Sequence, residues 1–202
     1  MRTAFQIIKG AFGIWWDTLM HLTFFNMLWV LAQFPIITGP PATAAMYALA
    51  ARFIERDLIV PKDFFVELKR MFLSAWKWGA LNILIVGLLV MNFVSSVGEQ
   101  GEIWFCLRYV WMILGVLWYM LNLFYWPFWL SQDDQRITNT FRNSFMMLLG
   151  MPLTIVTISV ICAVLILISF VAIFPLALAL MVWLSIIGML TVQWAIKEAG
   201  QQ

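Results

Sequence analysis

Long apolar runs constrain the fold of this chain more than any other feature of its sequence. A run of about 20 apolar residues forms a helix that can cross the hydrocarbon core of a bilayer. Of the 202 residues, 64% are hydrophobic and only 11% are charged, whereas soluble domains use charged residues at about 25% of positions. The sequence therefore predicts an all-α, polytopic transmembrane helical bundle embedded in the lipid bilayer. The same composition, with a net charge of only +2, excludes a soluble globule, a disordered chain and a nucleic-acid-binding protein.

The positions of these runs predict about six membrane spans. They cover approximately Thr18–Ile37, Pro41–Ile54, Gly79–Val97, Trp104–Leu130, Leu148–Phe170 and Val171–Ile196. All but the second are long enough for a span, which needs about 20 apolar residues. The second is shorter, so a full crossing and a re-entrant segment are both open for it.

The placement of basic residues predicts which side of the membrane each connection faces, because Lys and Arg favour the cytoplasmic side of short loops. If the N-terminus is cytoplasmic and all six segments cross, every Lys and Arg except Arg108 lies on the cytoplasmic side. If only the second segment failed to cross, the basic block from Arg52 to Lys77 would lie outside. We therefore expect a multi-pass protein of the cell membrane with both termini in the cytoplasm.

An amphipathic stretch precedes each pair of spans. The three stretches are Ala4–Trp16, Phe64–Trp78 and Ile137–Gly150. Each contains a basic residue followed three positions later by Phe, and basic residues beside aromatic ones suit a helix in the headgroup layer. We interpret residues 1–202 as a single integral membrane domain with three repeat-like units, at about residues 1–54, 61–130 and 134–197, each an interfacial helix followed by a transmembrane hairpin.

The most unusual local string is FPIITGPPATAAMYALAARF, which begins at Phe34. Its prolines cannot donate backbone hydrogen bonds and its glycine admits unusual dihedral angles, so a helix must break there. Freed backbone groups at membrane depth are tolerated when they are buried in protein or line a wet cavity. We name Pro35, Thr38, Gly39, Pro40 and Tyr47 as a candidate helix-break or ligand site. A tight hairpin turn followed by close packing of small residues is the favoured alternative.

Polar side chains inside the spans are the other candidates, because such residues are costly in lipid. Asp17 and His21 lie one helical turn apart and could relay a proton, although a hydrogen-bonded interfacial pair is favoured. Arg108 could hold an anionic ligand, but pairing with Glu102 or extending outward to the headgroups is favoured.

Four asparagines recur within the spans. They are Asn26, Asn82, Asn92 and Asn122. Buried amides can hydrogen-bond between helices, and they could also line a groove for a sugar. The structural interpretation is favoured over the sugar groove.

The string from Phe34 to Phe53 resembles the signature of the DUF624, or YesL-like, family of bacterial membrane proteins. The segments FFVELKRMF and TFRNSF are similar to the layout of the same family. The resemblance implies a bacterial cell-membrane protein of this size and topology that is associated with carbohydrate uptake systems. It implies no catalytic residues.

No motif in the sequence indicates an enzyme. One His and two dispersed Cys provide no metal-ligand set, and no phosphate-binding loop or nucleophile elbow is present in the sequence. We therefore expect a non-enzymatic protein without a metal or cofactor. It would be an accessory or regulatory component linked to carbohydrate uptake, with a transporter complex as a partner. A small transporter or channel in its own right is the alternative, and the oligomeric state is open.

Overall fold

The computed structural model describes residues 2–17, 19–171 and 179–200, and within them it contains eight α-helices and no strand. The helices are α1 (Arg2–Asp17), α2 (Leu19–Gln33), α3 (Gly39–Ile54), α4 (Pro61–Val97), α5 (Glu102–Ser131), α6 (Ile137–Gly150), α7 (Pro152–Val171) and α9 (Leu180–Ala199). The predicted all-α class is confirmed.

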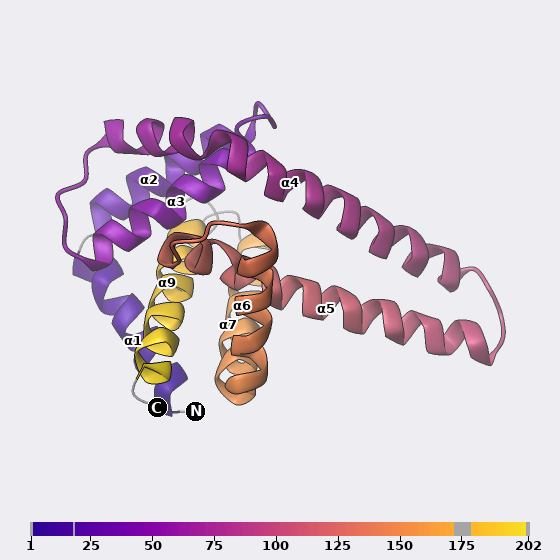
Figure 1. Cartoon of the computed structure of the whole chain (residues 1–202). Helices are drawn as coiled ribbons and strands as arrows, with labels where there is room; N and C mark the ends of the chain where they lie inside the picture. Colours follow the sequence, from indigo (N-terminus) through magenta and orange to yellow (C-terminus); the bar gives the residue numbers. More distant parts are fainter. Residues whose placement is uncertain (1, 18, 172–178, 201–202) are drawn as a thin grey trace.

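Helices α3 and α9 form the centre of a packed body, and α4 and α5 form a long hairpin that extends away from it (Figure 1). Helix α3 contacts both α4 and α9, while α5 contacts α9 and α6. Helix α1 packs along α9, so the beginning and the end of the described chain lie at the same end of the molecule.

Four helices in the described part of the chain are long and apolar enough to cross a membrane, namely α4, α5, α7 and α9. The prediction of a helical membrane protein is confirmed to that extent. Helices α2 and α3 contain only 15 and 16 residues. The helix predicted from Thr18 to Ile37 ends at Gln33, because the Pro and Gly residues that follow cannot continue it.

Two predicted boundaries near the C-terminus also differ from the structure. The segment predicted from Leu148 to Phe170 is divided between α6 and α7, since Pro152 lacks an N–H and keeps Met151 out of the helical region, at φ −137° and ψ 54°. The last segment, predicted to begin at Val171, contains α9 from Leu180, and Val171 itself belongs to α7. Residues 172–178, near the start of that predicted segment, lie outside the described residues.

All three amphipathic stretches are helical. The first lies in α1 and the third is α6, whereas the second is the first half of α4 and continues into the span without interruption over 37 residues. The threefold repeat stays a prediction.

Small residues let the central helices approach closely. Almost every residue of α3 between Gly39 and Ala50 is buried, and five of the buried residues are alanine. A Cβ atom at Gly79 of α4 would lie 3.0 Å from Cγ of Pro40, and one at Gly188 of α9 would lie 3.0 Å from Cγ of Pro127. At both crossings a proline ring occupies the space that a side chain on the facing glycine would need.

Candidate functional site

At the break between α2 and α3, side chains donate hydrogen bonds to two backbone carbonyl groups. Oγ1 of Thr38 donates to the carbonyl oxygen of Ala32 over 2.5 Å, and Nε1 of Trp76 on α4 donates to that of Ile37 over 2.8 Å. Ile36 has φ +54°, an unusual conformation for a β-branched residue. The carbonyl groups of Ala32 and Ile37 therefore find their partners within the protein.

An open apolar groove of about 590 Å³ lies beside this break. It is lined by Pro35, Ile36, Ile37, Phe72, Leu73 and Trp76. Ile36 is 78% exposed, so the groove faces outward from the body. Of the candidate residues, only Pro35 lines the groove, which has an apolar character suited to an acyl chain or an apolar side chain.

The other candidate residues of the string that begins at Phe34 lie apart from the groove and make different contacts. Pro40 packs against Gly79, and a Cβ at Gly39 would meet only the flexible end of Gln33, at 2.9 Å from Oε1. Tyr47 lies two helical turns further along α3, where it contacts α5 and α9. The structure does not bring the five candidates together into one site.

Tyr47 compensates for a proline on α5. Pro127 lies inside α5 and has no N–H, so it cannot bond the carbonyl of Leu123 one turn earlier. The hydroxyl of Tyr47 donates to that carbonyl oxygen over 3.5 Å. Tyr47 is 5% exposed, and its ring also lies 3.3 Å from the position of a Cβ at Gly188. This side chain thus links α3, α5 and α9.

Two of the four asparagines form a reciprocal arrangement at the base of the α4–α5 hairpin. Trp78 Nε1 donates to Asn122 Oδ1 over 2.9 Å, and Trp118 Nε1 donates to Asn82 Oδ1 over 3.0 Å. The Nδ2 atoms of Asn82 and Asn122 donate to the carbonyls of Trp78 and Trp118 on their own helices, at 2.9 and 2.8 Å. We call these four residues the Trp–Asn clasp. Each helix contributes a Trp and, four residues later, an Asn, so the antiparallel pairing satisfies both indoles and uses both amides.

The other two asparagines have different surroundings. Asn26 is fully buried, and its Oδ1 accepts the backbone N–H groups of Met181 and Val182 at 2.9 and 3.3 Å. It therefore caps the start of α9 from another helix, where α9 has no side-chain cap of its own. Asn92 is exposed on α4, and its Nδ2 donates to the carbonyl of Leu88 over 2.7 Å.

Arg108 caps the far end of the hairpin. Its Nε donates to the carbonyl of Ser96 over 2.9 Å and its Nη2 to that of Glu99 over 2.6 Å. These carbonyls lie at the C-terminal end of α4, where a positive charge is stabilising. Within the described residues Arg108 forms no ion pair with Glu102.

His21 lies on the surface of the body. It is exposed and lines a pocket of about 370 Å³ together with Phe53, Arg56 and Asp57. The side chain of Asp17 lies outside the described residues, so the Asp17–His21 relay stays a prediction.

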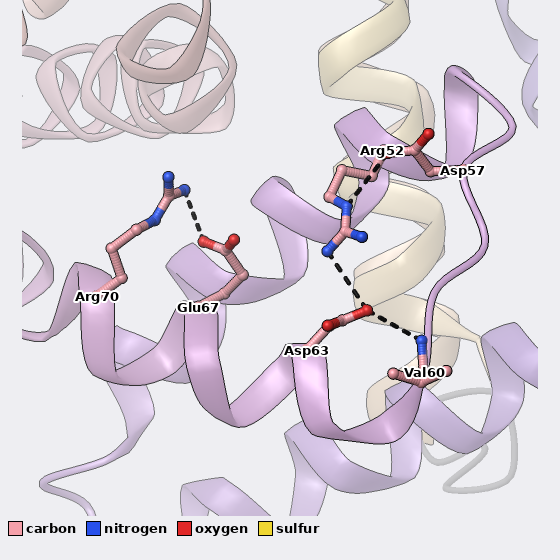
Figure 2. Close-up of polar contacts among 6 residues, drawn as sticks. All are labelled: Arg52, Asp57, Val60, Asp63, Glu67 and Arg70. Carbon is pink, nitrogen blue, oxygen red and sulfur yellow. Dashed lines mark hydrogen bonds and ion pairs between the residues drawn. The ribbon is translucent and has the colours of Figure 1, made fainter.

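A polar network that the sequence analysis missed fixes the connection between α3 and α4 (Figure 2). Arg52 lies within 3.4 Å of Asp57 through Nε and within 3.4 Å of Asp63 through Nη1. The same carboxylate of Asp63 accepts the N–H of Val60 over 3.0 Å. One turn further on α4, Nη2 of Arg70 lies 2.6 Å from Oε2 of Glu67. The signal in the sequence was an Arg in the last turn of one helix followed by an Asp in the first turn of the next.

A comparison with protein families shows which part of the chain is similar to a known family. Residues 22–93 match the model of the DUF624 family, whose description is a protein of unknown function. This segment of the chain resembles DUF624. The predicted resemblance is thereby confirmed over α3, most of α2 and most of α4. No curated protein and no solved structure matches the chain.

The DUF624 segment contains most of the contacts just described. It includes the helix break, Tyr47, the Arg52 network and one half of the Trp–Asn clasp, while Trp118 and Asn122 lie beyond it. In the described part of the chain, no three His, Cys, Asp or Glu side chains are grouped closely enough to hold a metal ion.

Proposed function

We propose that this DUF624 protein is a non-enzymatic component of the bacterial cell membrane that assists or regulates a carbohydrate uptake system. The YesL-like resemblance of its sequence supports the link to uptake. The observation that carries the proposal is the α4–α5 hairpin, whose spanning windows have only 6% of their residues buried in this chain. Such an apolar surface needs lipid or the apolar face of another membrane protein to cover it.

We also propose six crossings with both termini in the cytoplasm. At 1.5 Å per residue, α2 and α3 would extend about 22–24 Å, somewhat less than a hydrocarbon core of about 30 Å. Local thinning of the bilayer accommodates such a shortfall at modest cost. Helix α6 would then lie in the cytoplasmic headgroup layer as an interfacial element, whereas α1 packs along α9 and the first half of α4 continues directly into its span.

Cysteine labelling in intact cells tests this topology. The starting protein carries Cys106→Ser, which removes the exposed native thiol. We expect a membrane-impermeant reagent to label Ile36→Cys and Gln100→Cys from outside and Leu58→Cys only after lysis. Labelling of Leu58→Cys from outside, or protection of Ile36→Cys in intact cells, would contradict the six-span arrangement.

Photo-crosslinking tests the accessory role. A photoreactive amino acid at Ile113 on α5, which is 59% exposed, should capture a subunit of a sugar transporter in native membranes. The same group at Leu167 on α7, which is 64% exposed, is the control for chance encounters. Equal capture at both positions, together with unchanged sugar uptake after deletion of the gene, would refute the proposal.

The second candidate function, a small transporter or channel, is supported by the helix break. Helices interrupted by Pro or Gly are typical of transport sites. A path along this break would require the bonds from Thr38 and Trp76 to open. Purified protein in liposomes would then show sugar flux that changes in Gly39→Leu, and the absence of flux for every sugar tested would exclude this candidate.

A further inference from the structure

Asn92 on α4 differs from the other three asparagines in what its side-chain oxygen contacts. The Oδ1 atoms of Asn26, Asn82 and Asn122 each accept a hydrogen bond from another helix. Asn92 forms one side-chain hydrogen bond, from Nδ2 to the carbonyl of Leu88 on its own helix. Its Oδ1 and the second N–H of its amide therefore have no partner in the described part of the chain.

This amide lies on the hairpin that extends away from the body (Figure 1). Asn92 is exposed, and at 1.5 Å per residue it lies about 7 Å before the end of α4 at Val97. In the proposed crossing of α4, this depth lies within the hydrocarbon core of about 30 Å. An unpaired amide that faces lipid at this depth is costly, because lipid tails neither donate nor accept hydrogen bonds.

Asn92 borders a regular face of α4. Leu84, Leu88, Met91 and Ser95 are all exposed and follow one another at intervals of four, three and four positions. This spacing places them along one side of the helix, and it is the spacing by which two helices pack against each other. Asn92 directly follows Met91 and therefore flanks the same side. The face is suited to packing against a second helix, and it carries an amide at its edge.

A second copy of this chain complements the amide. Two copies inserted with the same topology present Asn92 at the same depth, and a twofold axis along the membrane normal makes their α4 helices parallel. Each amide has one N–H to donate and one oxygen to accept, so two copies form two reciprocal hydrogen bonds. A lipid tail offers neither group, and a different protein would need a polar side chain at this same depth.

We propose that the face of α4 formed by Leu84, Leu88, Met91 and Ser95 joins two copies of this chain, with the amides of Asn92 bonded across the interface. Polar residues join membrane helices in this way because apolar surface alone does not favour another helix over lipid. The inference rests on the proposed crossing of α4 and not on a role in sugar uptake. The cysteine labelling described above tests that crossing separately, so failure of the topology and failure of the dimer can be told apart.

Disulfide formation in native membranes tests the face. In the Cys106→Ser protein, Leu88→Cys should give a crosslinked dimer on mild oxidation, because a disulfide needs Cα atoms within about 7 Å of each other. Val90→Cys is the control, since Val90 is 54% exposed against 51% for Leu88 and lies on the opposite side of α4. No crosslink at Leu88→Cys, or equal crosslinking at both positions, would overturn the proposal.

Energy transfer between fluorescent tags on purified full-length protein in liposomes tests the amide. As the protein-to-lipid ratio rises, the parent protein should dimerise. We expect Asn92→Leu to weaken dimerisation about tenfold or more, because two hydrogen bonds between helices are lost. Asn92→Gln keeps an amide and should stay within about threefold of the parent.

The fold of the single chain is the control for these variants. At ratios where the protein is monomeric, Asn92→Leu should unfold much like the parent, because Asn92 bonds only Leu88 in its own chain. A parent protein that stays monomeric at every ratio would refute the proposal, as would equal dimerisation of Asn92→Leu. Capture of a different membrane protein by a photoreactive group at Leu88, with the purified protein monomeric, would assign this face to that protein and also overturn the proposal.

Discussion

Helix α9 and the α4–α5 hairpin are both apolar enough to cross a membrane, yet they are packed in opposite ways. In the most apolar window of α9, 61% of the residues are buried inside the protein, against 6% for α4 and for α5. Helix α9 has Ser185, Gly188 and Thr191 among its buried positions, and its neighbour α3 is rich in Ala. The hairpin instead exposes large side chains such as Ile83, Met91 and Ile113.

This difference shows that hydropathy and side-chain size determine different properties of a helix. Hydropathy decides that a helix avoids water, but lipid tails are as apolar as Leu, so it does not drive one helix onto another. Small residues allow close contact and large ones favour lipid, which is why helices of similar composition form the body in one place and a projecting hairpin in another.

The contact at Gly188 gives the sharpest test of this distinction. A side chain there would meet Cγ of Pro127 at 3.0 Å, Cε1 of Tyr47 at 3.3 Å and the carbonyl of Leu123 at 3.4 Å. We expect Gly188→Leu to lower the free energy of unfolding in detergent by about 3 kcal/mol, since overpacking typically costs about 1–3 kcal/mol and here involves three helices.

Gly87 on the hairpin is the matched control, because no atom lies within 4 Å of a Cβ built there. Gly87→Leu should leave the unfolding free energy the same or slightly higher, as Leu is also the better helix former. Equal losses in the two variants would mean that the body and the hairpin do not differ in packing.

The Trp–Asn clasp joins α4 and α5 by two hydrogen bonds and tests whether the hairpin is held by specific bonds. We expect Asn82→Leu to cost about 1–2 kcal/mol, the upper part of the range for hydrogen bonds between membrane helices, because the indole of Trp118 loses its acceptor. Asn92→Leu should cost much less, since Asn92 bonds only its own helix.

A double-mutant cycle isolates the clasp from other effects of these changes. Trp118→Phe combined with Asn82→Leu should show a coupling of about 0.6–1.7 kcal/mol. Trp118→Phe combined with Asn92→Leu should be additive. A coupling of zero in the first pair would show that the bond between Trp118 and Asn82 contributes nothing to the stability of the hairpin.

Tyr47 tests the contact between α3 of the body and the turn of α5 that precedes Pro127. Tyr47→Phe should cost about 1 kcal/mol, because the carbonyl of Leu123 then lacks both a helical N–H and the hydroxyl. Pro127→Ala restores that N–H, so the same Tyr47→Phe change should cost clearly less in the Pro127→Ala protein. The comparison is made by chemical unfolding of all four proteins, and an unchanged cost would show that Tyr47 acts only through its ring.

The sequence predicted elements of this structure where a single residue type has a local effect. Pro35, Gly39 and Pro40 predicted the helix break, and Asn82 and Asn122 were named as amides able to bond between helices. Their partners could not be predicted, because Trp78 meets Asn122 and Trp118 meets Asn82 only in one register of two helices far apart in the chain. The same reason hides the pairing of Tyr47 with Leu123, a contact across 76 residues.

The network around Arg52 tests a contact outside the apolar packing of either region, at the connection that joins α3 of the body to α4 of the hairpin. The side chains of Arg52, Asp57 and Asp63 are 33%, 54% and 24% exposed, so water and salt screen the attraction between them. Arg52→Gln should therefore lower the free energy of unfolding by less than about 1 kcal/mol at low salt.

Lys62→Gln is the control, because Lys62 is exposed at the start of α4 and forms no ion pair within the described residues. The difference between the two variants should shrink as NaCl is raised toward 1 M. A difference that persisted unchanged would mean that Arg52 acts through packing of its alkyl chain and not through its charge.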